Sequence, residues 1–140
     1  MVKYLALVSL IILVFVFFPR RLRTTKLSIK NRLYNLEIAS SLSQKAKGLS
    51  HRTFLCSNCG MIFTFSTEAI HPFWMKNTLI PLDIIWLDQQ GRVVTIITGQ
   101  PNDQSPLQNT SPAKYVIELN AGDTQGLGLK IGDIIGLPAL

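Results

Sequence analysis

The sequence predicts a small, mainly β domain, folded as a closed or nearly closed β-barrel with one or two short helices, behind an N-terminal transmembrane helix. Three observations lead to this prediction. A fifteen-residue apolar run, interrupted only by Ser9, occupies residues 4–18. The rest of the chain contains six or more short apolar segments separated by polar turns, which is typical of β-barrels and sandwiches. Only residues 40–47 and 121–129 have the composition of short helices.

The apolar run from Tyr4 to Phe18 predicts a membrane anchor. In a helix it spans about 22 Å, which is short against a hydrocarbon core of about 30 Å, but flanking arginine side chains can reach the interface. The residues after Phe18 are Pro, Arg, Arg, Leu and Arg, and they offer no small-x-small cleavage site. We therefore expect an uncleaved signal-anchor with a basic flank over residues 1–26 and a β-domain over residues 27–140.

The charge distribution does not decide on which side of the membrane the domain lies. It does argue against a nucleic-acid partner. The basic residues that follow the apolar run outnumber those before it, which favours a cytoplasmic domain, whereas exported domains often follow an N-terminal anchor of this kind. The formal net charge of the chain is +6, but residues 27–140 contain nine basic and eight acidic residues. A nearly neutral domain lacks the basic surface that phosphate backbones require.

The elements of the domain follow from period-two alternation and turn residues. A hairpin is expected around the polar break at residues 30–32, a short helix ends near Gly48, and Gly91 closes a four-residue turn. Residues 99–112 are polar and predict a long surface connection. We expect strands at 27–29, 33–38, 60–65, 73–77, 82–87, 92–98, 115–119 and 134–137.

The segment from His71 to Trp86 is the strongest candidate for a functional site. Lys76, Asn77 and Asp83 interrupt an otherwise apolar stretch, and an unpaired buried polar group costs ~1–3 kcal/mol. These groups are therefore expected either to pair with one another or to bind something. The predicted ligand-binding set comprises Arg52, Trp74, Lys76, Asn77, Asp83, Glu118 and Asn120.

Three functions remain open on these residues. In the first, the set binds a small anionic or sugar-like ligand, or a partner, with Trp74 as a flat surface. In the second, the residues are structural: the tryptophans fill the core and Lys76 pairs with Asp83 or Glu118. In the third, paired carboxylates hydrolyse a small or glycan-like substrate. The common hydrolase, nucleotide and metalloprotease motifs are absent from the sequence, and we expect no cofactor.

Cys56 and Cys59 are separated by two residues and are the chain's only cysteines. They can form a disulfide in a turn if the domain faces an oxidising compartment, or remain structural thiols. Together with His51 and His71 they could ligate a metal, but the spacing fits no usual zinc motif. A redox role needs the first cysteine at a helix start, whereas this pair precedes a predicted strand. We expect no metal site.

A series of motifs runs through the domain in a fixed order: Lys47-Gly48-Leu49, Gly60-Met61, Phe63-x-Phe65, Phe73-Trp74-Met75-Lys76-Asn77-Thr78, Ile80-Pro81-Leu82-Asp83-Ile84-x-Trp86, Tyr115-Val116-x-Glu118-Leu119-Asn120-Ala121-Gly122 and Gly128-Leu129-Lys130-x-Gly132-Asp133. This pattern resembles domain-of-unknown-function family 192 (DUF-192), an uncharacterised protein family. The resemblance covers most of residues 27–140 and implies a small, mainly β domain, commonly behind an N-terminal signal or membrane segment, with no assigned reaction. Cys56 and Cys59 are not part of the family pattern.

Overall fold

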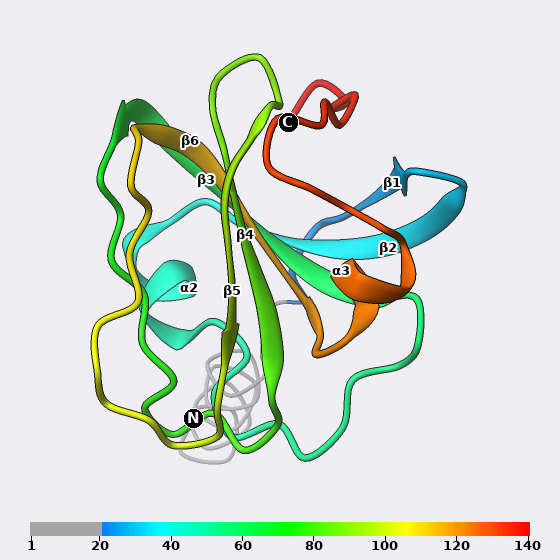
Figure 1. The fold of residues 1–140 in the computed structure, drawn as a ribbon. Coiled ribbons are helices and arrows are strands. Elements are labelled where there is room, and N and C mark those ends of the chain that lie inside the picture. Colours follow the sequence, from blue (N-terminus) through cyan, green and yellow to red (C-terminus); the bar gives the residue numbers. More distant parts are fainter. Residues whose placement is uncertain (1–20) are drawn as a thin grey trace, which may run out of the picture.

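The short apolar segments pair into one six-stranded mixed sheet, shown in Figure 1. The computed structural model describes residues 21–140, and within them two short helices accompany the sheet. The elements are β1 (Thr24–Ile29), β2 (Arg32–Ala39), α2 (Leu42–Lys47), β3 (Cys59–Ala69), β4 (Leu82–Leu87), β5 (Val93–Gly99), β6 (Ala113–Asn120) and α3 (Asp123–Gly126).

The sheet is open, so the prediction of a closed or nearly closed barrel is wrong. The strand order is β1-β2-β3-β6-β4-β5, in which β1 pairs with β2 and β5 pairs with β4. All neighbouring strands are antiparallel except β2 and β3, whose parallel pairing requires the crossover that contains α2. The sheet is strongly twisted, and β1 and β2 lie across the direction of β4 and β5 (Figure 1).

The central strands of the sheet are buried on both faces, so the sheet need not close to cover them. Alternate residues of β4 and β6 point to opposite sides, so that Ile85 and Ile117 belong to one apolar cluster and Ile84 and Val116 to the other. The C-terminal segment covers the first face through Leu129 and Ile135. The second face is covered by loop residues, including Leu49, Leu55 and Met75. Each face therefore obtains its cover from connecting segments rather than from the sheet curling on itself.

The predicted helix after β2 is confirmed as α2. Ser41 caps it: the Ser41 hydroxyl accepts from the Gln44 backbone N–H at 3.3 Å, and Gln44 Oε1 accepts from the Ser41 N–H at 3.0 Å. This reciprocal capping box stabilises the first turn. The helix ends at Gly48, whose φ of +48° and ψ of −134° lie in a region that side chains with a Cβ avoid.

Two of the predicted strands are absent from the described residues. Residues 73–77 form an isolated bridge between Phe73 and Leu107, followed by a turn in which the Thr78 N–H donates to the Met75 carbonyl at 3.0 Å. The expected last strand at 134–137 is reduced to one bridge between Arg92 and Ile134. Both segments are apolar because they cover the sheet, and not because they extend it.

The predicted anchor at residues 4–18 lies outside the described residues. Within residues 21–140, no helix combines the length and apolar character needed to cross a membrane.

Candidate functional site

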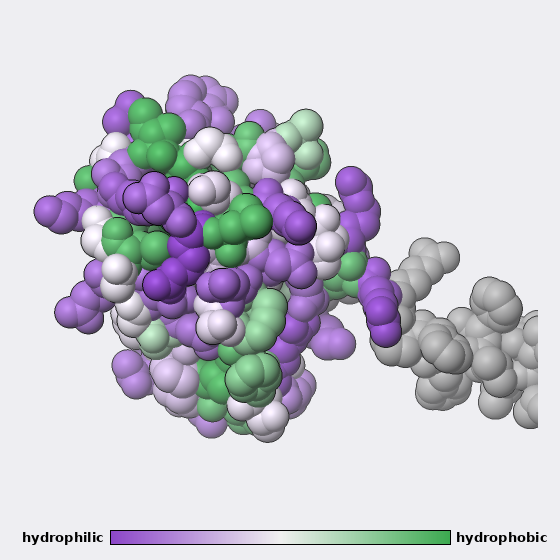
Figure 2. All heavy atoms as spheres, turned by 90° about the vertical axis from the view of Figure 1, so that its right-hand side faces the viewer, coloured by the Kyte–Doolittle hydropathy of each residue, from purple (hydrophilic) through white to green (hydrophobic). Residues whose placement is uncertain are grey.

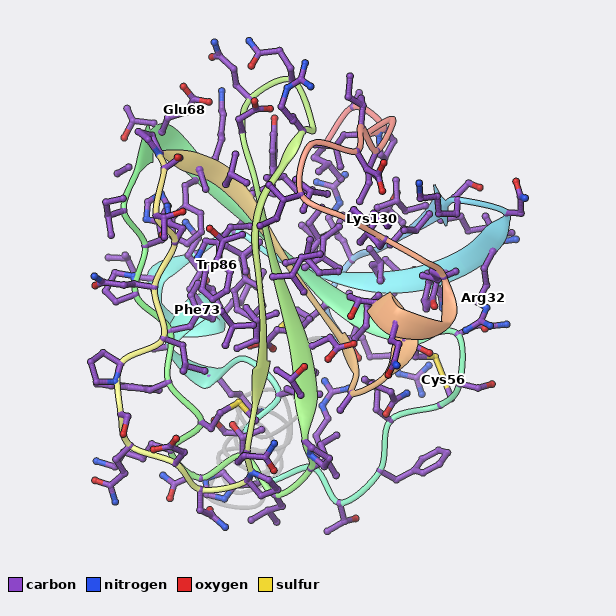
Figure 3. All side chains as sticks on the ribbon, viewed as in Figure 1. Arg32, Cys56, Glu68, Phe73, Trp86 and Lys130 are labelled. Carbon is purple, nitrogen blue, oxygen red and sulfur yellow. A yellow bond between two sulfur atoms is a disulfide. The ribbon has the colours of Figure 1, made fainter. Side chains whose placement is uncertain are left out.

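A pocket of about 200 Å³ opens between α2, the Gly48 turn, β3 and the segment 72–78. Its lining includes four aromatic side chains: Phe63 and Phe65 come from β3, and Phe73 and Trp74 from the following connection. Phe63 is buried, whereas Trp74 is 62% exposed at the mouth. The Phe73 ring meets Phe63 and the buried Trp86 edge-to-face, with centroids 4.9 and 5.7 Å apart. Figure 3 shows Phe73 and Trp86 together beside α2.

Glu118 on β6 supplies the only carboxyl group among the described lining residues. Its register partners are Met61 and Ile84, so the carboxyl emerges from the apolar cluster under the pocket. The residue is 5% exposed, and Oε2 is buried without a hydrogen-bond partner among the described residues. Burial raises the pKa of Glu118 to about 8, although the charge of Arg52 acts in the opposite direction. At neutral pH the carboxyl is therefore mainly protonated and can donate a hydrogen bond.

Arg52, predicted as a ligand contact, instead pairs with Glu37. Its two terminal nitrogens donate to the two carboxylate oxygens at 2.6 and 2.8 Å, the bidentate geometry that favours arginine. The hydrogen bond from Arg52 to Glu37 raises the pKa of the guanidinium, and the proximity of Glu118 contributes to the same shift. Arg52 does not line the pocket, but its charge acts on Glu118 from behind it.

Two loops form the rim of the pocket and are joined by one backbone hydrogen bond. The His51 N–H donates to the Asn77 carbonyl at 2.8 Å. Both residues have a positive φ, +65° for His51 and +59° for Asn77, a conformation that is uncommon without glycine. A Cβ on Gly48 would lie 3.5 Å from the Phe63 ring and 3.9 Å from Glu118 Oε2. The absence of a side chain at this position therefore keeps the approach to Glu118 open.

Lys76 and Asn77 occupy the middle of the turn between Met75 and Thr78. Asn77, at the third position, has the positive φ that a type II turn requires. Both side chains are exposed, and neither residue lines the pocket. The expected pairing of Lys76 with Asp83 or Glu118 is wrong for the described structure, whose ion pairs do not include Lys76.

Asp83 is buried on β4 and accepts hydrogen bonds from two neighbouring elements. Its Oδ1 accepts from the Thr98 hydroxyl at 2.7 Å. Its Oδ2 accepts from the Gly122 N–H at 3.0 Å, the Thr124 N–H at 2.9 Å and the Thr124 hydroxyl at 2.7 Å. Asp83 therefore joins β5 and the start of α3 to β4 through hydrogen bonds to neutral groups, and not through the expected pair with Lys76.

Asn120 holds the cysteine loop against the end of β6. Its side-chain N–H groups donate to the carbonyls of Leu55 and Cys56, both at 3.1 Å. Cys56 and Cys59 form a disulfide with a Cα–Cα separation of 5.1 Å, and the Cys59 N–H donates to the Cys56 carbonyl at 3.0 Å. Figure 3 places Cys56 on the other side of the molecule from Phe73, so this loop is separate from the pocket.

Of the predicted set, the structure thus brings Trp74 and Glu118 together in one pocket. Sequence reasoning missed Lys45, Gly48, Phe65 and the role of Phe63. A signal for the phenylalanines was present, because residues 61, 63 and 65 of one strand share a face with Glu118 once β3 and β6 pair. The position of Lys45 depends on the crossover path of α2, for which the sequence contains no comparable signal.

The fold and the pocket define a small open-sheet domain with one buried acidic group under an aromatic mouth. The chain belongs to the DUF192 family, described as "Uncharacterized ACR", whose model matches residues 24–137. This confirms the family resemblance seen in the sequence. A search of curated proteins finds no match to the chain.

Two solved structures are similar to it. A protein of unknown function from Novosphingobium aromaticivorans DSM 12444 is 35% identical, with a TM-score of 0.79 over 83% of this chain and 86% of that one. A "putative transcription regulator" from Sinorhizobium meliloti 1021 is 32% identical, with a TM-score of 0.72 over 81% of this chain and 90% of that one.

Proposed function

We propose that this protein is a membrane-anchored binding domain that holds a small ligand in the pocket between α2, β3 and segment 72–78. The unpaired Oε2 of buried Glu118 carries the proposal. A buried polar atom without a partner costs ~1–3 kcal/mol, which a ligand that hydrogen bonds to it recovers. A carboxyl group with a strongly raised pKa inside a cleft is also a general mark of functional sites.

Binding is better supported than hydrolysis by a pair of carboxylates. Glycoside hydrolysis requires two carboxyl groups that face the same bond, and Glu118 stands alone among the described lining residues. The nearest alternative, a purely structural cluster, accounts for Asp83 but not for Glu118, whose buried Oε2 has no hydrogen-bond partner within residues 21–140.

We do not extend regulation of transcription from the Sinorhizobium protein to this chain. Residues 27–140 carry nearly balanced charge, and nucleic-acid binding depends on a strongly basic surface. Figure 2 shows the face around β1, β2 and α3, on which apolar side chains form separate small groups between hydrophilic ones.

The anchor is part of the proposal. We infer that residues 1–26 form an uncleaved signal-anchor and that the domain faces an oxidising compartment. The support for the first statement is the apolar run at 4–18. The support for the second is the Cys56–Cys59 disulfide, because such bonds persist mainly outside the reducing cytosol.

Thermal unfolding of the full chain in detergent tests the binding function. A panel of small metabolites and glycans is screened against wild type, Trp74→Ala and Phe54→Ala. The two variants are matched, since Trp74 and Phe54 are both exposed, at 62% and 75%, but only Trp74 lines the proposed pocket. Without ligand, both should unfold within about 0.5 kcal/mol of wild type.

A ligand at about one hundred times its Kd stabilises the folded state by about 2.7 kcal/mol. We expect this shift in wild type and Phe54→Ala and its loss in Trp74→Ala. Equal shifts in both variants would place binding elsewhere, and a panel without any stabilising compound would count against the binding function.

A further inference from the structure

The charges around the pocket are unbalanced in favour of an anion. Lys45 and Lys47 both line it, at the end of α2. Neither forms an ion pair with a described residue. Lys45 Nζ lies 4.3 Å from the centroid of the Phe65 ring, and burial lowers the pKa of this ammonium group. A partly desolvated cation without a carboxylate partner gains most from an anionic ligand.

The base of the pocket does not compensate this positive charge. Glu118 is mainly neutral at pH 7, and Arg52 beyond it is already neutralised by Glu37. A neutral carboxyl has one O–H donor and an accepting oxygen. It can therefore hydrogen bond to the oxygens or hydroxyl groups of a ligand without repelling a negative charge elsewhere on it.

The walls and the volume set the size of the ligand's body. Four aromatic side chains, Phe63, Phe65, Phe73 and Trp74, surround the space. The pocket has a volume of about 200 Å³, and an apolar cavity of about 150 Å³ accepts benzene. One six-membered ring therefore fits in this space, which is smaller than the pockets of about 300–1,000 Å³ that usually hold drug-sized molecules.

From these observations we propose that the pocket binds a small carboxylate that carries one six-membered ring, with the ring between Phe63, Phe73 and Trp74 and the carboxylate at Lys45. The inference rests on the proposed binding function and specifies its ligand class. Aromatic acids and sugar acids share this chemistry, since both combine a ring with a carboxylate. The polar groups of a sugar ring would be directed to Glu118, Ser50 and Thr78, which line the same space.

Calorimetric titration of the full chain in detergent with four probes tests the proposal. Benzoate, benzamide and benzylammonium have the same ring with negative, neutral and positive substituents, and glucuronate replaces the aromatic ring by a sugar ring. We expect benzoate or glucuronate to bind at least about tenfold more tightly than benzamide and benzylammonium. One charge-assisted hydrogen bond to the carboxylate would give a difference of this size. The tighter of the two carboxylates identifies the ring type.

Two variants test the roles of the individual groups. Lys45→Met should weaken the binding of the preferred carboxylate about tenfold or more and leave benzamide unchanged. Lys130→Met, which removes an exposed lysine that does not line the pocket, should alter neither. Glu118→Leu should weaken the binding of the carboxylate and of benzamide alike, because both probes lose the same hydrogen-bond partner.

Tighter binding of benzylammonium than of benzoate would overturn the proposal and make this a site for cations. The proposal would also be overturned if Lys45→Met and Lys130→Met lost equal amounts of affinity for benzoate. If no probe binds at millimolar concentration while another compound stabilises wild type but not Trp74→Ala, the ligand class is wrong and the binding function stands. If nothing binds in either experiment, both fail.

Discussion

In the proposed binding function, Glu118 is the residue at which binding and stability make opposite demands. Its pKa is raised from 4.5 to about 8 in the folded protein, so between these values the folded state binds a proton that the unfolded state releases. Stability must then decrease as pH rises through this interval, fully retained below about 4.5 and lost by about 8. The shift corresponds to a loss on the order of 5 kcal/mol.

Urea unfolding between pH 5 and 8 measures this effect. Wild type should become steadily less stable, whereas Glu118→Gln, which is neutral throughout, should lose most of that dependence and be more stable than wild type at pH 8. Glu68→Gln serves as the control, because Glu68 is an exposed carboxylate on β3. Parallel pH profiles for wild type and Glu118→Gln would show that Glu118 is ionised in the folded protein.

Single residues were predictable where burial alone decides their role. Trp86 was expected in the core and is fully buried, with its indole N–H donating to the His71 carbonyl at 2.9 Å. Lys76 and Asn77 lie in an exposed turn, and their position was not predictable because a polar pair inside an apolar run also describes a turn between two covering segments. The pairing partners of Asp83 lie 15 to 41 residues away in sequence, and no local pattern specifies them.

At the scale of elements, the sequence predicted those features that depend on interactions between neighbouring residues. The end of α2 near Gly48 was predictable, and the capping box of Ser41 and Gln44 at its start also depends on neighbouring residues only. The hairpin between β1 and β2 follows in the same way from its polar break. The prediction of strands at residues 73–77 and 134–137 was wrong, because an apolar strand and an apolar loop that covers a sheet have the same composition.

Asp83 joins three elements, and its replacement should separate them. Asp83→Asn turns one accepting oxygen into a donor that faces the N–H groups of Gly122 and Thr124 or the Thr98 hydroxyl. The loss of charge-assisted hydrogen bonds at a buried site should cost roughly 2–4 kcal/mol. Chemical denaturation measures it, with hydrogen exchange at residues 122–129 as a local readout of α3.

Lys76→Ala is the matched comparison, because Lys76 is exposed and unpaired among the described residues. It should change stability by no more than about 0.5 kcal/mol. An Asp83→Asn protein of wild-type stability that no longer binds ligand would restore Asp83 to the binding site and contradict its structural role.

At the scale of the whole molecule, the open sheet shows what composition alone missed. Six short strands suggested closure, but every residue of β4 is buried, as in sheets covered on both faces. Residues 82–87 are all apolar except Asp83. This near-continuous apolar run already indicated a strand that is buried on both faces. In a barrel, strands alternate between interior and solvent, and this segment does not.

The proposed membrane anchor could leave the domain on either side of the membrane. The positive flank after the apolar run favours a cytoplasmic domain, whereas the Cys56–Cys59 disulfide favours an oxidising compartment. We give the disulfide more weight, because it closes a loop that Asn120 also holds, while the charge rule is a tendency. After alkaline extraction of membranes from cells that express the full chain, the protein should remain in the membrane fraction.

Thiol labelling then determines the side. In bacterial spheroplasts, a membrane-impermeant maleimide should label the protein only after treatment with an impermeant reductant, because both cysteines are oxidised and outside. A Cys56→Ser, Cys59→Ser variant contains no cysteine and gives the background. Labelling that needs lysis but no reductant would place the domain in the cytoplasm with free thiols. The charge flank would then determine topology, and ligands for the pocket would have to be sought inside the cell.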